Sequence, residues 1–275
     1  MLGGCGAKTA MLSPIANEPA QMLADETGFS ADLKALPLPK EKIVVGVYRF
    51  QDQTGQYKDV AASTGGSSIS YSKALTQGAL SVLVKALEDS GWFTVVEREG
   101  LDNLLKEREL IRSTRAQFSA EGGEKLSPIP PLLYAGILIE GGVIGYDSNT
   151  FTIGAGYNYF GLGGSAEMRK DVVTVYVRAI AVKTGEILKT VTSSKTIISR
   201  KLQGGCFKYV KLKRLLEAEA GLTTNEPVQL AVTEALQCAV YQLTMEGIIS
   251  QFWFLKNPED IKAKSFVEYM KETRQ

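Results

Sequence analysis

The chain has 275 residues, of which 44% are apolar, and its 31 basic and 30 acidic side chains give a net charge of +1. This length and composition exclude a disordered chain and a small protein held together by disulfides. The near-neutral net charge does not attract nucleic acid or anionic lipid to the protein as a whole, although a local basic patch remains compatible with it. The absence of His excludes His-dependent nucleophiles, HExxH zinc sites and imidazole acid/base pairs, while three Cys at unrelated spacings fit neither a disulfide framework nor a CxxC site.

Residues 1–41 lack sustained hydrophobic periodicity, which predicts a tether ahead of the folded part of the chain. Residues 2–5 read Leu-Gly-Gly-Cys. Small residues before a cysteine are typical of bacterial lipoprotein signals, because the processing protease accepts only small residues beside the thiol that becomes acylated. Cys5 is therefore a candidate lipidation site, although four residues are equally compatible with a chance match.

From residue 42 onward, strand and helix patterns alternate. Residues 43–50 form a nearly continuous β-branched and aromatic run, which predicts a strand covered on both faces. A small-residue loop follows at 62–70, and helical spacing predicts a helix over 75–87 that ends at Ser90-Gly91. The other expected elements are strands over 92–96, 137–144, 172–182 and 187–192 and helices over 101–111 and 225–243. Together these elements predict an α/β core.

Two stretches, 146–170 and 193–211, have a different pattern and are predicted to be β-hairpins. In the first, apolar residues alternate strictly with small or polar ones over 149–159, a length that suits a strand crossing a bilayer at a tilt. The alternation in the second is weaker. An ordinary antiparallel sheet, with one face packed on the core and the other exposed to solvent, explains both patterns equally well. In a membrane, the lipid-facing residues would be Phe151, Ile153, Tyr157, Tyr159, Ile198, Phe207 and Tyr209.

Hydrogen bonding decides what a membrane interpretation requires. The longest apolar run, 132–139, is far shorter than the roughly 20 residues of a spanning helix, so only strands can cross. Two separate hairpins cannot close a barrel, because their outer strands would leave unpaired backbone groups in hydrocarbon. Copies of the chain must then pair edge to edge around a ring, so the membrane interpretation predicts a homo-oligomer.

Seven segments between residues 36 and 255 carry a specific resemblance. They are KIVVGVY at 42–48, QDQTGQ at 51–56, WFTVVEREGLDNLLKER at 92–108, EGGVIGYDSN at 140–149, TGEIL at 184–188, RLLE at 214–217 and TNEPV at 224–228. In sequence and in order they closely resemble the CsgG family, the curli production assembly/transport component.

The resemblance implies an α+β fold in which a periplasmic α/β domain (42–145, 171–192 and 212–275) carries hairpins 146–170 and 193–211. In this family the hairpins join one oligomeric transmembrane β-barrel, formed by a ring of nine copies. The chain is then an outer-membrane lipoprotein, anchored by an acyl chain such as palmitate on Cys5. The implied function is secretion of unfolded curli subunits, which form amyloid fibres, by diffusion without ATP. The implied partners are sibling copies, the curli subunit, a periplasmic capping adaptor, a surface nucleation partner and outer-membrane lipid, with no nucleic acid.

The family narrows its pore at a loop after the Gln-Asp-x-Thr-Gly-Gln segment, which corresponds here to 57–72. Relatives carry a Tyr, an Asn and a Phe at the narrowest rings, and this sequence departs from that pattern with a longer loop. Counting forward from Gln56 and backward from the following helix gives two sets of candidates. The candidate constriction residues are Val60, Thr64, Gly65, Ser70 and Tyr71. Packing of Tyr71 against the following helix is the alternative to a place in the constriction.

Other chemistry has little support in the sequence. The Gly154-Ala155-Gly156 segment lacks the GxGxxG spacing, and the carboxylates near residue 100 interleave with basic residues as a solvated helix face does. We therefore expect no enzyme, no cofactor and no metal site, with Cys206 and Cys238 as packing or idle thiols. The competing function is a periplasmic lipoprotein adaptor that anchors a surface adhesion structure.

Overall fold

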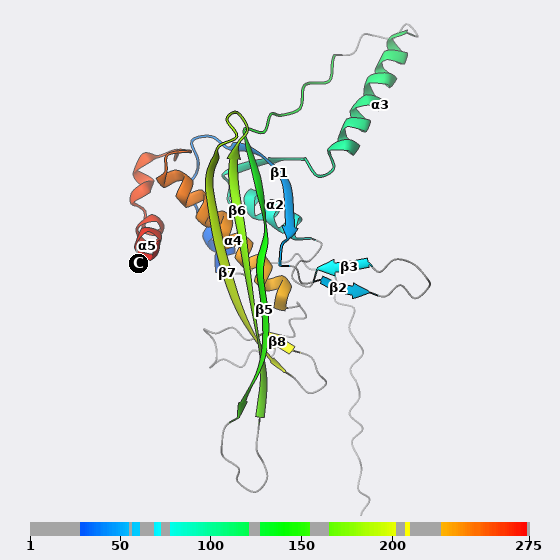
Figure 1. The fold of residues 1–275 in the computed structure, drawn as a ribbon. Coiled ribbons are helices and arrows are strands. Elements are labelled where there is room, and N and C mark those ends of the chain that lie inside the picture. The colour runs from blue at the N-terminus through cyan, green and yellow to red at the C-terminus, as the bar shows by residue number, and fades with distance from the viewer. Residues whose placement is uncertain are drawn as a thin grey trace, which may run out of the picture.

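An open sheet of six strands forms the centre of the fold (Figure 1). The computed structural model describes residues 28–54, 57–60, 69–72, 78–120, 127–154, 165–201, 207–209 and 227–273. The strands are β1 (Ile43–Asp52), β2 (Tyr57–Val60), β3 (Ile69–Ser72), β4 (Phe93–Val96), β5 (Ile137–Gly154), β6 (Ser165–Ala181), β7 (Ile187–Lys201) and β8 (Phe207–Tyr209). The helices are α1 (Gly28–Lys34), α2 (Ala79–Asp89), α3 (Leu101–Ala120), α4 (Pro227–Ile249) and α5 (Lys264–Thr273), with a 3₁₀ turn η2 at Pro258–Lys262.

The sheet has the order β4-β1-β5-β6-β7-β8, and β2 pairs only with β3 in a separate hairpin. β1 runs parallel to both β4 and β5, whereas every neighbouring pair from β5 to β8 is antiparallel. Short connections join the later strands, and such connections suit antiparallel neighbours. The expected mixture of helices and strands is therefore confirmed as an α+β fold. Within the described residues the sheet stays open and no barrel closes.

The core lies between one face of the sheet and the helices α1, α2 and α4. Alternate residues of β6 from Val173 to Ala179 are fully buried against α4. Each buried Val or Leu side chain of this layer contributes about 1.5 to 3 kcal/mol to folding. α4 is apolar around most of its surface because the sheet, α1 and α2 all contact it. No helix of the described chain combines the length and apolar character needed to cross a membrane.

Most predicted elements are present, and several of them are longer than predicted. The strand predicted at 43–50 is β1, and the helix predicted at 75–87 is α2, which is described from Ala79 and is followed by Gly91 with φ of 71°. The helix predicted at 101–111 continues to Ala120. The strands predicted at 137–144 and 172–182 are longer in the structure, because the core strands run directly into the predicted hairpin 146–170.

The C-terminal helix α5 is held against α4 and β7 by a polar contact. The Tyr269 hydroxyl donates to Glu246 Oε1 at 2.9 Å, and Lys189 Nζ lies 2.6 Å from Glu246 Oε2. Burial disfavours the charged form of Glu246, but the hydrogen bonds from Lys189 and Tyr269 outweigh this effect and lower its pKa. Burial and the bond to Glu246 raise the pKa of Tyr269, so this hydroxyl stays protonated and able to donate.

At the end of α4 the core is closed by a close contact between Gly247 and the side chain of Trp253. A Cβ atom at Gly247 would lie 1.8 Å from Cζ2 of Trp253, whose side chain is buried and donates from Nε1 to the Thr244 carbonyl at 2.9 Å. Only glycine lets the indole ring cross the helix backbone at this distance.

We predict that Gly247→Ala destabilises the fold by about 1 to 3 kcal/mol, because the indole ring must leave its site. The matched control is Gly136→Ala, since an added Cβ there has no neighbour within 4 Å. Urea unfolding followed by the near-ultraviolet circular dichroism of tryptophan measures both variants. Equal midpoints for the two variants would contradict the prediction.

Candidate functional site

Beyond the core, the sheet continues as a long antiparallel ribbon. We define the ribbon as residues 145–154 of β5, 165–172 of β6, 196–201 of β7, and β8. Figure 1 shows β5 and β6 running well past the end of α4. β6 pairs with β7 from Met168 and Arg200 into the core, so the two predicted hairpins are not separate. This pairing corrects the expectation of two independent hairpins and gives each chain one four-stranded unit.

Both edges of the ribbon lack a strand partner in the described chain. β5 pairs with β1 only as far as Val143, which leaves the edge from Ile144 to Gly154 open. On the other side, β8 covers only residues 199–201 of β7. Open edges expose rows of backbone donors and acceptors, which invite pairing with another strand.

The register assigns the ribbon residues to two faces, because residues directly opposite each other share a face. The inner face continues the face that α4 covers, and the outer face is its reverse. Phe151 and Ile153 lie on the outer face opposite Met168 and Ala166, and Ile198 lies there opposite Lys170. Phe207 and Tyr209 pair with inner-face positions Lys201 and Ser199 and so lie on the inner face.

The register thus brings three of the predicted lipid-facing residues to one face and two to the other. Tyr157 and Tyr159 lie outside the described residues, as does the candidate lipidation site Cys5. Lipid contact by this set stays a prediction.

The predicted constriction loop 57–72 contains the β2–β3 hairpin. Val60 ends β2 opposite Ile69, and Ser70 and Tyr71 lie in β3 opposite Asp59 and Lys58. The candidates Thr64 and Gly65 lie outside the described residues. The structure therefore brings Val60, Ser70 and Tyr71 into one two-stranded element.

The residues just before this hairpin anchor it to the sheet. Asp52 Oδ1 accepts bonds from the backbone N and the hydroxyl of Thr54, at 2.8 and 2.6 Å, which fixes a tight turn. Gln53 donates from its backbone N to the Val143 carbonyl at 2.8 Å and from Nε2 to the Tyr176 hydroxyl at 2.9 Å. The QDQTGQ segment carries the family resemblance but gives no indication of Tyr176, which is 123 residues away and has no local signal of its own.

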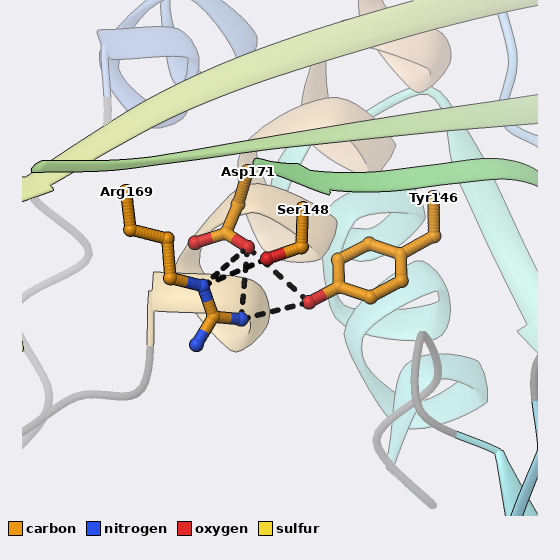
Figure 2. Close-up of polar contacts among 4 residues, drawn as sticks. All are labelled: Tyr146, Ser148, Arg169 and Asp171. Carbon is orange, nitrogen blue, oxygen red and sulfur yellow. Dashed lines mark hydrogen bonds and ion pairs between the residues drawn. The ribbon is translucent and has the colours of Figure 1, made fainter. Parts of the chain in front are cut away.

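A polar cluster lies where the ribbon leaves the core. We call Tyr146, Ser148, Arg169 and Asp171 the junction cluster, and Figure 2 shows these four side chains converging on the inner face. Arg169 Nε donates to Asp171 Oδ1 and to Ser148 Oγ, each at 2.9 Å. Arg169 Nη2 donates to the Tyr146 hydroxyl at 2.9 Å, and that hydroxyl donates to Asp171 Oδ1 at 3.2 Å.

The junction cluster ends the apolar core. Asp171 is fully buried on the same face of β6 as Val173, and its second oxygen, Oδ2, has no hydrogen-bond partner among the described residues. Further along the ribbon the inner-face positions of β5 are Thr150 and Thr152. On β5, the face that packs on α4 in the domain therefore continues with polar residues past this cluster. The cluster cannot be recognised in the sequence, because Arg169 and Asp171 fit an ordinary polar segment of a hairpin.

We predict that Asp171→Ala destabilises the fold by about 3 to 5 kcal/mol, because it leaves the Arg169 guanidinium without its buried counter-charge. Asp147→Ala serves as the control, because it removes an exposed carboxylate from the outer face of the same strands. Thermal unfolding in detergent measures both. A loss for Asp171→Ala no larger than that for Asp147→Ala would mean that the cluster is not stabilising.

Comparison with known proteins gives a consistent result. The family model "Curli production assembly/transport component CsgG" matches residues 27–273. The relative of that name from Salmonella typhimurium (strain LT2) is 42% identical over 238 residues, which cover 86% of this chain and 83% of the relative. The one from Escherichia coli (strain K12) is 41% identical over the same shares.

The likeness to a solved structure with a related fold is weaker. A PelC dodecamer from Paraburkholderia phytofirmans is 13% identical, with a TM-score of 0.28, over 76% of this chain and 91% of that chain. That likeness is too low to support an argument about assembly. The family model and the close relatives, in contrast, span nearly the whole chain. The chain therefore belongs to the CsgG family, the curli production assembly/transport components.

Proposed function

We propose that this chain assembles with copies of itself into an outer-membrane channel that secretes unfolded curli subunits. Family membership supports a role in curli production and transport and a location in the outer envelope. In the proposed arrangement the ribbons of a ring, nine copies in number, form one transmembrane β-barrel. The helix-covered domain faces the periplasm, and an acyl chain on Cys5 in the tether 1–41 anchors each copy to the membrane before the ring forms.

The observation that carries this proposal is the four-stranded ribbon with two open edges. In hydrocarbon, each unpaired backbone group of an open edge costs several kcal/mol, so an isolated ribbon cannot span a bilayer. The open edge of β5 in one copy and the β7–β8 edge of the next satisfy each other if the copies are arranged around a closed ring. The barrel is then built from sibling chains, and its strand pairing supplies the assembly energy.

The helix α3 supports head-to-tail assembly independently. No described side chain of this 20-residue helix is buried, and Figure 1 shows α3 standing apart from the sheet. Three of its apolar side chains are about half exposed, namely Leu105, Leu110 and Phe118. A single long helix without packing is marginal in water, so these exposed apolar side chains favour contact with a partner. A neighbouring copy meets this requirement in a ring, because each copy both offers α3 and receives that of its neighbour.

The hairpin β2–β3 is the proposed constriction. Its root is fixed to the sheet by Asp52, Gln53 and Tyr176, so equivalent hairpins of successive copies would project at one height. The candidate lining residues are Val60, Thr64, Gly65, Ser70 and Tyr71. A narrow collar of this kind passes an extended chain and rejects folded proteins.

Transport through such a channel needs no nucleotide. A disordered chain held in a closed vestibule loses conformational entropy, and it regains this entropy on release, which biases diffusion outward. This mechanism requires a cap on the periplasmic side and capture on the outer side. The proposed partners are accordingly a periplasmic capping adaptor and a surface nucleation partner.

We predict that Leu110→Glu prevents ring formation while leaving the monomer folded, because the Leu110 side chain is 58% exposed and adds little to the core of the described chain. Electron microscopy of detergent-purified protein should show rings for the wild type and few for the variant, and planar bilayers should show current steps only for the wild type. Ser119→Glu introduces the same charge at an exposed position on the opposite side of α3 and should retain rings if only the side that carries Leu110 is an interface.

Two outcomes would contradict the proposal. Wild-type protein that stays monomeric in plain buffer and gives no current would instead support the periplasmic adaptor. Normal rings from Leu110→Glu would exclude α3 from the interface.

We predict that Tyr71→Ala raises single-channel conductance, because it removes the largest side chain among the candidate constriction residues. Ser70→Ala, its neighbour in β3, changes much less volume and serves as the control. Identical conductance for wild type and Tyr71→Ala would remove Tyr71 from the constriction.

A further inference from the structure

The domain sheet has a free edge at β4. This strand pairs only with β1, in parallel, so its other edge has no strand partner in the described chain. The Ile43 backbone N–H donates to the Trp92 carbonyl at 2.9 Å. Hydrogen-bonding groups alternate between the two sides of a strand, so Phe93 and Val95 direct their N–H and C=O groups away from β1. These groups are available to a further strand.

An apolar groove lies directly beside this edge. We call the groove between α2 and β4 the β4 groove, and its volume is about 450 Å³. Val95 shares a face with its buried partner Val45, so its side chain borders the groove while its backbone groups point to the free edge. A strand added to β4 would place every second side chain over the groove. The apolar residues that line it are Val47, Leu80, Val84, Val95 and Val96.

The rim of the groove offers negative charge to a partner. Both cations of the rim already bind groups of their own chain. Lys85 Nζ lies 3.0 Å from Asp89 Oδ2, and Arg98 donates to two backbone carbonyls at 2.8 and 3.2 Å. Glu88 and Glu99 are exposed, and neither forms an ion pair within the described residues. An extended segment with apolar residues at alternate positions, flanked by basic residues on the same face, therefore complements this groove.

The groove also lies close to the proposed constriction along the chain. β1 ends at Asp52 and α2 begins at Ala79, and the β2–β3 hairpin lies between them. Figure 1 shows α2 beside β1 and the hairpin next to the end of β1. In the proposed channel the helix-covered domain faces the periplasm, so the β4 groove lies on the periplasmic side of the constriction. A polypeptide bound there as a strand already has the extended form that a narrow collar passes.

We propose that the β4 groove binds an extended segment of the unfolded polypeptide in transit, which adds to the free edge of β4 as a further strand. This inference rests on the proposed function, because it places the groove on the route of a secreted chain. Backbone hydrogen bonds supply sequence-tolerant affinity, and the apolar lining and the carboxylates select the face of the segment. Weak binding of this kind holds a chain near the constriction without stopping its passage.

The test measures binding of a fluorescent peptide to full-length protein in detergent by anisotropy, with rings and monomers separated by size. The probe is Lys-Thr-Val-Thr-Val-Thr-Lys, which presents two valines and two lysines on one face when extended. The wild-type ring should bind it. A version with N-methylated backbone amides cannot donate to a strand edge and should bind at least roughly 10-fold more weakly. A version with Glu in place of Lys should also bind more weakly.

Two variants locate the site on the protein. Glu88→Gln/Glu99→Gln removes two exposed carboxylates from the rim and should weaken binding of the lysine probe roughly 5-fold. Glu109→Gln/Glu186→Gln removes the same charge at exposed positions elsewhere and should bind as the wild type does. Val95→Pro removes a backbone N–H that points away from β1, a position at which an edge strand tolerates proline, and should weaken binding roughly 10-fold. The methylated probe needs no variant, so the test does not depend on the folding of Val95→Pro.

Several results would overturn the inference. Equal binding of the methylated and unmethylated probes would exclude strand addition. Equal loss in the Glu88→Gln/Glu99→Gln variant and its control would show an effect of total charge. Binding to monomers but not to rings would mean that a neighbouring copy covers the groove, which would then be an assembly contact.

Failure of the inference and failure of the proposed function are distinguishable. Current steps in planar bilayers report the channel alone, and Glu88→Gln/Glu99→Gln should still produce them. If channels form but the probe does not bind at the β4 groove, only the groove assignment is wrong. If the probe binds but no channel forms, the pore assignment fails, and the assignment of the bound segment to a chain in transit fails with it.

Discussion

The pairing of β6 with β7 is the constraint on which the rest of this structure depends. It continues without interruption from the helix-covered core to Met168 and Arg200, so the ribbon is a direct extension of the core sheet. Hydrogen bonds at right angles to the strands transmit the twist and direction of the core into the ribbon. The helices α2 and α4, which bury one side of the sheet, thereby set the angle at which the ribbon leaves the domain. The position of one part cannot change without repacking the other.

Along β5 the polarity of the two sheet faces changes with distance from the core. In the domain the inner face is apolar and the outer face is exposed to water, with Val175 inside and Thr192 outside on neighbouring strands. Past the junction cluster the inner-face positions of β5 are Thr150 and Thr152 and its outer-face positions are Phe151 and Ile153, whereas Phe207 and Tyr209 of β8 take inner-face positions. A buried ion pair next to the last core valines ends the apolar layer at a fixed position. A shift of strand register would place the two charges among apolar side chains, which is costly. This change along β5 suits a protein whose two parts contact different solvents.

The sequence was sufficient for the element types and the family, and insufficient for the contacts between distant segments. Alternation at 149–159 identified strands because a period of two is a local property. It did not reveal that β6 pairs with β7, since partner choice depends on the core to which both strands belong. The helical spacing after Leu101 predicts an apolar side but not that no described side chain of this helix is buried. Tyr176 escaped notice because its role depends on Gln53, which approaches it only in the fold.

The anchoring of the β2–β3 hairpin has a consequence for the proposed channel. Asp52 and Gln53 bond to Thr54, Val143 and Tyr176, so the described support of the hairpin comes from residues that precede it and from the sheet. If the hairpin forms the proposed constriction, the width of the opening and the frame that supports it are specified by different parts of the sequence. A set of chains that differ only between Val60 and Ile69 would then give openings of graded width on a common frame.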